Sequence, residues 1–521
     1  MKNITLKTSF VLVVAILILT SVLTACSPQK PASSTGGVLN IGHNINPNSL
    51  DPVRSTFAAD IFVHAQIYDS LLRFDSEGNI VPWLCTSWEF KDDTTLTLNL
   101  RKGVTFHDGT DFNAGAVKQQ FDRLKKPEMA SLMTRMIQEF ESIEVIDDYT
   151  LAIKTKRPMP YLLNLLAGRI GRINSPAAIE KWGDDYGIKA ATGTGPFKLV
   201  KWVQDTEIVL EKNKDYWAKD ENGKQLPYLD GLVFKLIPDP ATMYSNLITQ
   251  GVDIAGILPV DFQRAQQQAD LKMVSGPIAL SYGTFVDCTR PPFDNIKVRQ
   301  AVAYATDKDE LLQAVAYGSG VKIGHFVPPG LFGYDPTITG YTYDPEKAKK
   351  LLSEAGYDEK NPLRFTATEV KLTGFDIEAE VLQSQLARVG IEMKLDVVDS
   401  NVMIGRLMTH NYNVIVFGTA FTSIPLDPQG TMDIFYGAKG FWNAGRIVDA
   451  ELDAMIQKAG VTMDKDSRKV ILHDIQQYMI DKAYDWWYFG LTGAMGMQQY
   501  VMGYTHSITG DPMLERVWLD K

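Results

Sequence analysis

The chain has 521 residues, of which 45% are hydrophobic and 22% charged, and its formal net charge is -10. This length exceeds what one hydrophobic core usually organises, so we expect two or three domains. The acidic balance argues against a nucleic-acid partner, because a phosphate binder needs a cationic face. It also argues against broad electrostatic adhesion to anionic lipid, so any link to a membrane should be covalent.

The N-terminus has the anatomy of a secretory signal peptide over residues 1–25. Lys2 and Lys7 precede an apolar run at residues 10–19, which is too short to span a bilayer comfortably. The sequence LTAC at residues 23–26 then resembles the bacterial lipobox, in which the chain is cut before the cysteine and the cysteine sulfur carries lipid.

The lipobox resemblance implies that Cys26 is lipidated and that the mature chain is anchored to the cell membrane on its extracytoplasmic side. That side is the periplasm in two-membrane cells and the cell surface in one-membrane cells. A plain signal peptide with an accidental cysteine is the alternative. Residues 26–37 are rich in Pro, Ser and Gly, so we expect a flexible tether that holds the folded body off the membrane.

The two remaining cysteines, Cys85 and Cys288, lie in segments that we assign to different domains, so both are expected to be free thiols. The sequence contains no CxxC and no HxxxH spacing. We therefore expect neither a metal site made by the protein alone nor a cofactor.

The first half of the chain predicts mainly strands. Apolar alternation and turn residues indicate strands at residues 38–41, 94–100, 232–237 and from 252, and hairpins at 143–154 and 197–210. Helical spacing indicates helices at residues 60–72 and 242–250. A third helix is predicted to begin at a cap formed by Asn113 and to run through residue 124.

The second half alternates between helices and strands. Helices are predicted at residues 295–305, 308–317, 345–355, 377–389, 402–408, 448–459 and 467–482, and strands near 364–367, 392–398 and 414–417. This alternation implies βαβ units and an α/β fold.

Six stretches resemble, in order, one family: the extracellular solute-binding proteins family 5, which are peptide- and nickel-binding lipoproteins of ABC importers. They are IYDSLLRF (67–74) with GNIVPWL (78–84), LRKGVTFHDGT (100–110), GTGPF (193–197), NKDYW (213–217), PFD (292–294) with VRQA (298–301), and YDPEKA (343–348) with EAGY (354–357). These motifs are mainly turns and core aromatics, so they identify a fold without naming the ligand.

The resemblance implies an α/β, two-lobed periplasmic-binding-protein fold (type II, cluster C) with an extra subdomain in the first lobe. The expected parts are a signal peptide (1–25), a tether (26–37), lobe I (38–56, 185–276 and 488–521), the extra subdomain (57–184) and lobe II (277–487). Such a protein closes on its ligand and presents the closed form to a permease with its ATPase. It needs no bond chemistry, so we expect a monomeric receptor and not an enzyme.

Two arginines are candidates for gripping a ligand carboxylate. Arg169 and Arg172 precede the sequence NSP at residues 174–176. In nickel- and metallophore-binding relatives an arginine in the equivalent stretch holds ligand carboxylates, a role that suits the bidentate and permanently charged guanidinium. The alternative is a pair of solvated arginines on a loop.

The loop at residues 418–429 is expected to form the opposite wall of the cleft, with Thr419, Phe421 and Asp427 as candidates. Peptide binders of the family commonly carry an acid in this loop for the peptide's amino group, but residues 418–426 contain none. The nickel binder's histidine also has no counterpart at residues 436–443. Asp427 is interpreted as a turn-former in preference to an amine anchor.

The remaining candidates are polar and aromatic side chains that border the cleft or could stack on a ligand. They are Asn44, Asn46, Phe57, Trp442, Trp487 and Tyr488. Core packing is the alternative for the aromatic residues.

The sequence therefore favours a lipid-anchored receptor that captures short peptides for an ABC importer. A receptor for nickel or another metal held as a small carboxylate chelate is the first alternative. A secreted hydrolase is the second, although the chain carries no GxSxG or HExxH. A sensor or adhesin without a permease is the third.

Overall fold

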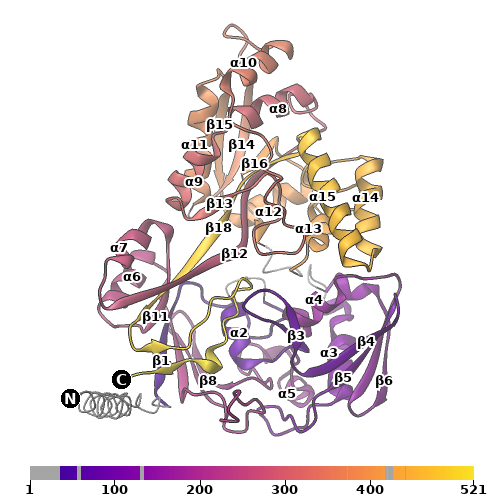
Figure 1. The fold of residues 1–521 in the computed structure, drawn as a ribbon, viewed down its shortest axis with the longest axis vertical. Coiled ribbons are helices and arrows are strands. Elements are labelled where there is room, and N and C mark those ends of the chain that lie inside the picture. The colour runs from indigo at the N-terminus through magenta and orange to yellow at the C-terminus, as the bar shows by residue number, and fades with distance from the viewer. Residues whose placement is uncertain are drawn as a thin grey trace, which may run out of the picture.

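The computed structural model describes residues 36–55, 60–129, 134–371, 374–416, 419–420, 426–440 and 442–521. Within these ranges one 12-stranded sheet runs through both lobes of the molecule (Figure 1). Its strand order is β15 (Glu392–Val398), β14 (Arg364–Val370), β16 (Val414–Val416), β12 (Leu271–Val286), β18 (Asp485–Gln498), β11 (Ile254–Ile257), β1 (Val38–His43), β10 (Gly231–Leu236), β9 (Glu207–Lys212) and β8 (Phe197–Val203). β13 (Gly320–Lys322) pairs with β18, and β17 (Thr419–Ala420) pairs with β12.

Two long strands, β12 and β18, connect the lobes. They pair in antiparallel register from Leu271 opposite Gln498 to Phe285 opposite Asp485, with an irregularity between Pro277 and Ser281. One end of the pair lies beside β11 in lobe I and the other beside β16 in lobe II (Figure 1). The predicted lobe boundaries at 276/277 and 487/488 fall within these strands.

Lobe I is built around β1, which pairs in parallel with β10 and β11. α2 (Ile61–Ile67), α6 (Pro240–Ile248) and α7 (Phe262–Gln266) accompany this part of the sheet, and β19 (Val501–Met502) pairs with β20 (Trp518–Leu519) near the C-terminus. The predicted strands at 38–41 and 232–237 and the hairpin at 197–210 are confirmed.

A second sheet of four strands lies in the segment predicted to be an extra subdomain. Its order is β4 (Cys85–Asp92), β5 (Thr95–Leu100), β7 (Thr150–Thr155) and β6 (Phe140–Asp147). β2 (Leu72–Phe74) pairs with β3 (Ile80–Pro82), and α3 (Ala114–Leu124), α4 (Leu162–Ala167) and α5 (Pro176–Trp182) complete this region. The Asn113 side chain accepts a hydrogen bond from the Ala116 amide at 3.0 Å, which confirms the predicted cap.

Lobe II contains the predicted βαβ units. β14 is parallel to both β15 and β16, and α11 (Phe375–Ala387) and α12 (Ser400–Thr409) join these strands. The other helices of the lobe are α8 (Ile296–Ala305), α9 (Lys308–Ala316), α10 (Pro345–Glu354), α13 (Pro428–Phe435), α14 (Ala450–Val461) and α15 (Lys465–Lys482). Asp344 caps α10 by accepting from the Lys347 amide at 2.9 Å.

One helix prediction is wrong in its second half. The helix expected at residues 60–72 ends at Ile67, and Tyr68 is already extended with φ -123°. The chain turns there because Asp69 is drawn into a buried hydrogen-bond network, and β2 begins at Leu72.

Cys85 and Cys288 are free thiols, as predicted. In the described ranges no helix combines the length and the apolar character needed to cross a bilayer. The predicted signal peptide and Cys26 lie outside the described residues.

Candidate functional site

A single buried carboxylate draws three of the six family stretches together in lobe I. Asp69 is 4% exposed. One of its oxygens accepts from Trp83 Nε1 at 2.7 Å and the Tyr216 hydroxyl at 3.0 Å. The other accepts from Thr194 Oγ1 and Trp217 Nε1, both at 2.9 Å. Burial raises the pKa of Asp69, and the hydrogen bonds from Trp217, Trp83 and Thr194 oppose this rise. These motifs therefore fix the frame that carries the site.

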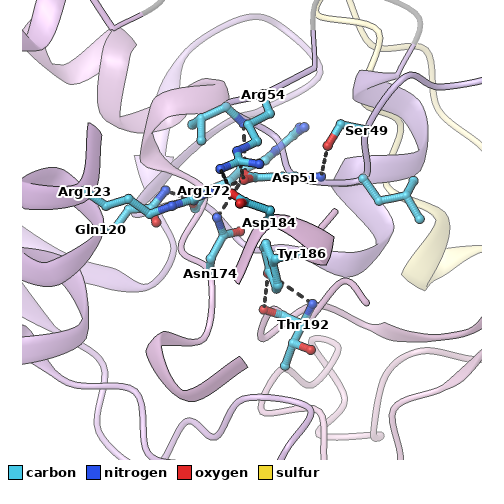
Figure 2. Close-up of polar contacts among 12 residues, drawn as sticks. Ser49, Asp51, Arg54, Gln120, Arg123, Arg172, Asn174, Asp184, Tyr186 and Thr192 are labelled. Carbon is cyan, nitrogen blue, oxygen red and sulfur yellow. Dashed lines mark hydrogen bonds and ion pairs between the residues drawn. The ribbon is translucent and has the colours of Figure 1, made fainter. Parts of the chain in front are cut away.

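A second buried acid ties the loop after β1 to the extra subdomain (Figure 2). The Asp51 side chain is fully buried, accepts from Asn174 Nδ2 at 3.1 Å and forms an ion pair with Arg123 of α3. Arg54 lies 3.9 Å from Asp51 and 3.5 Å from Asp184. The loop after β1, which was predicted to border the cleft, is thus fixed to the extra subdomain by buried contacts.

The two candidate arginines are buried in this frame. Arg172 is 3% exposed, donates to Asp511 Oδ2 at 3.0 Å, and its carbonyl accepts from Gln120 Nε2 at 3.3 Å (Figure 2). Arg169 is 5% exposed and donates to the Ser55 carbonyl at 2.9 Å. Burial lowers the pKa of Arg172, and it lowers the pKa of Arg169 to about 10. Both guanidiniums thus hold distant segments of lobe I together.

Asn46 and Asn44 differ in their surroundings. Asn46 donates to Gln204 Oε1 at 2.7 Å and Asp205 Oδ1 at 3.0 Å, and accepts from Trp202 Nε1 at 3.2 Å. It therefore fastens the first loop to the β8–β9 hairpin. Asn44 is exposed.

Asp427 has the geometry of a helix cap in a buried ion pair. It accepts from the Gln429 amide at 2.9 Å at the start of α13. Arg468 of α15 binds both of its oxygens, at 2.7 and 2.5 Å, and both side chains are 3% exposed. The carboxylate is thus fully engaged within lobe II.

The aromatic candidates lie in or against the core of lobe II. Trp487 is 2% exposed and packs edge-on against Phe285 at 5.6 Å, and Tyr488 is 1% exposed and donates to Thr284 Oγ1 at 2.9 Å. Trp442 is half-buried, with its ring 5.1 Å from that of Phe435. Phe57, Phe421 and Cys26 lie outside the described residues, as does the side chain of Thr419, whose backbone in β17 pairs with Ser281.

A cavity of about 680 Å³ lies between the extra subdomain and lobe II. Arg157 and Tyr161 line it from the side of α4, and Asp433 of α13 and Lys439 line it from lobe II. Asp433 accepts from Gln429 Nε2 at 2.9 Å, and burial raises its pKa. No sequence motif distinguishes these four residues. The usable signal for this cavity was Asp433, an acid on the inner face of α13.

A second cavity of about 720 Å³ lies beside the first, and its wall is more aromatic. Trp88 and Phe90 of β4 line it together with Phe332 and Leu426. Asn164 of α4 donates to the Leu426 carbonyl at 2.9 Å, so the two lobes are in direct contact beside this hollow. Among the described side chains no three His, Cys, Asp or Glu residues converge as metal ligands.

Two lobes joined by crossing strands, with cavities where they meet, define a two-lobed solute-binding protein of the type II fold. Residues 79–443 match the family model described as bacterial extracellular solute-binding proteins, family 5 Middle. The chain therefore belongs to family 5 of the bacterial extracellular solute-binding proteins, the substrate-binding components of ABC importers.

Individual relatives agree with this assignment. The chain is 31% identical to the glutathione-binding protein GsiB of Pectobacterium atrosepticum over 384 residues. This alignment covers 73% of this chain and 72% of that protein. The structure of DppA from Helicobacter pylori in complex with the peptide STSA is 25% identical, with a TM-score of 0.80 over 94% of this chain and 99% of that one. The structure of AgaA from A. tumefaciens R10 in complex with agropinic acid is also 25% identical, with a TM-score of 0.78 over 93% and 99%.

Proposed function

We propose that this protein captures short peptides, with tripeptides such as glutathione as the first candidates, and delivers them to an ABC permease from a lipid anchor on Cys26. The observation that carries the proposal is the match along nearly the whole fold to a relative that holds a four-residue peptide. The similarity to glutathione-binding relatives supports a peptide ligand of similar size. The LTAC sequence supports the anchor.

Capture requires a change of shape and no bond chemistry. A solute that contacts both lobes favours the closed arrangement by its difference in affinity for the two states. β12 and β18 are the described strands that link the lobes, and their pairing is irregular between Pro277 and Ser281. We infer that the lobes move about this point and that the permease recognises the closed form.

A small carboxylate solute that is not a peptide is the second candidate. It is supported by the similarity to AgaA, whose structure holds agropinic acid.

Native mass spectrometry of the full chain, purified gently from its own membranes in mild detergent, tests the proposal. We expect one solute per protein, with masses that match unmodified short peptides. A discrete adduct with the isotope pattern of a metal would contradict the peptide assignment and favour the chelate alternative.

A further inference from the structure

Glu378 of α11 is a buried acid with no counter-charge among the described residues. The residue is 0% exposed, and neither carboxyl oxygen has a hydrogen-bond partner in the described part of the chain. Burial raises the pKa of this carboxyl well above its usual range. Buried polar groups in folded proteins are almost always paired, so an unpaired carboxyl indicates a partner that joins later.

Topology places this acid at the edge of lobe II that faces lobe I. β12 enters lobe II in the direction of Val286, where it pairs with β16, and β17 pairs with it earlier, at Leu280 and Ser281. β16 therefore runs back toward lobe I, and the parallel strand β14 points the same way. α11 begins just after β14, with Glu378 in its first turn. Ligands of open parallel sheets bind outside these carboxyl ends.

Two aromatic rings, those of Tyr282 and Phe375, lie near the acid, and a third ring stacks on Tyr282. The Tyr282 ring lies 4.8 Å from both Phe375 and Phe489, and it stacks on Phe489 with an interplanar angle of 18°. Phe375 is one helical turn before Glu378 on the same buried face of α11. Glu378 also acts electrostatically on Tyr282 and contributes to the raised pKa of that hydroxyl.

Gly374 lets the chain pass close over this group. Its φ is +98°, and a Cβ there would lie 2.7 Å from the Tyr282 hydroxyl oxygen. Any other residue would press on the ring, so the backbone before α11 is fitted to the aromatic group.

Further carboxylates lie on β14 and α11 near the aromatic group. Glu369 at the end of β14 is 3% exposed, and its pKa is raised by burial and by the nearby carboxylates of Asp376 and Glu380. Asp376 also acts on Tyr282. The carboxylates at this end of β14 and α11 favour a cation over an anion. A carboxylate flanked by aromatic faces is the combination that binds ammonium and guanidinium groups.

We propose that Glu378, flanked by Tyr282 and Phe375, binds a positively charged amino or guanidinium group of the solute. This proposal rests on the proposed function, because it assumes that the solute is held between the lobes. The cation supplies the missing hydrogen bonds, and Glu378 releases its proton to solvent as the ion pair forms. Solute binding is therefore coupled to the release of one proton.

The test uses the full chain in mild detergent and two pools of tripeptides built from Ala, Val, Leu and Phe, one with free amino termini and one N-acetylated. The wild-type protein is expected to retain the free pool at least tenfold better. Glu378→Gln should abolish this preference, whereas Glu380→Gln, on the exposed face of the same helix, should keep it. At pH values below the pKa of Glu378, the affinity of the wild type for the free pool should increase as the pH rises, by up to tenfold per pH unit. The affinity of Glu378→Gln should not change with pH.

The outcomes separate this proposal from the proposed function. A Glu378→Gln variant that keeps the tenfold preference overturns the proposal. If the wild type retains neither pool, the peptide assignment fails, and Glu378 is tested on the solute that copurifies. A copurifying solute without an amino, ammonium or guanidinium group also overturns the proposal. Glu378→Met controls for folding: without solute it should be at least as stable as the wild type, because an unpartnered carboxyl is removed.

Discussion

The buried pair of Asp427 and Arg468 allows a quantitative test of whether Asp427 holds the fold or the ligand. Replacing Asp427 with Ala leaves the Arg468 guanidinium 3% exposed with only its Nε bond to the Ala459 carbonyl, at 2.9 Å. Breaking a buried pair in this way costs about 3–5 kcal/mol. Loss of the cap on the Gln429 amide adds about 1 kcal/mol. Asp427→Ala should therefore lower the free energy of unfolding by about 4–6 kcal/mol.

Urea titration followed by tryptophan fluorescence measures this loss, and three variants resolve its parts. Asp427→Asn keeps a capping side chain and should cost about 1 kcal/mol less than Asp427→Ala. The double variant Asp427→Ala with Arg468→Leu should recover most of the loss, because no charge stays buried alone. Asp464→Ala removes an exposed cap of α15 that accepts from the Ser467 amide at 2.9 Å, and should cost only about 1 kcal/mol. If Asp427→Ala is nearly as stable as wild type but no longer binds solute, the structural role is refuted.

Three further predictions concern lobe I and the anchor. Asp69→Asn leaves too few acceptors for four buried donors and should lower stability in urea by about 2–4 kcal/mol, and a neutral effect would contradict the network. Burial raises the pKa of Asp60 from 3.8 to about 6, so the folded state binds more protons than the unfolded state between pH 4 and 6. Stability should fall by up to about 3 kcal/mol as pH rises through that window, and Asp60→Asn should remove this component from titrations at pH 4, 5 and 6. Cys26→Ser should move the protein from the membrane to the soluble fraction of lysed cells, and retention in the membrane would rule out the lipid anchor.

Local signals predicted most of the individual elements. Asn113 and Asp344 were recognisable as caps because a side-chain oxygen that precedes an amphipathic run can satisfy a free amide of the first turn. The alternation of strands and helices from residue 364 to 416 likewise predicted parallel pairing, because βαβ units have few ways to pack.

The strands that connect the lobes were harder to recognise. β12 contains Gly276 and Pro277 in its middle, and both residues usually weaken a strand assignment. They are tolerated because the pairing with β18 is irregular just beyond Pro277. Nothing local signals that a strand of 16 residues will cross from one lobe to the other.

The partners of the candidate site residues depend on contacts across the whole chain. Arg172 pairs with Asp511, which is 339 residues away, and Asp427 pairs with Arg468 on a different helix. Residue type and position in the sequence marked Arg172 and Asp427 as candidates for the ligand site. Which oppositely charged side chain each of them contacts depends on the fold. Glu378 is the reverse case, since its sequence context is an ordinary helix and only its burial makes it notable.

Small-angle X-ray scattering of the full chain, stripped of solute and then saturated with the solute recovered from it, tests the central claim of capture by lobe closure most directly. We predict a smaller radius of gyration with solute, at one solute per protein, and recovery of that solute unchanged in mass. An identical scattering curve at saturation would contradict closure, and recovery of cleaved products would contradict a receptor that performs no bond chemistry.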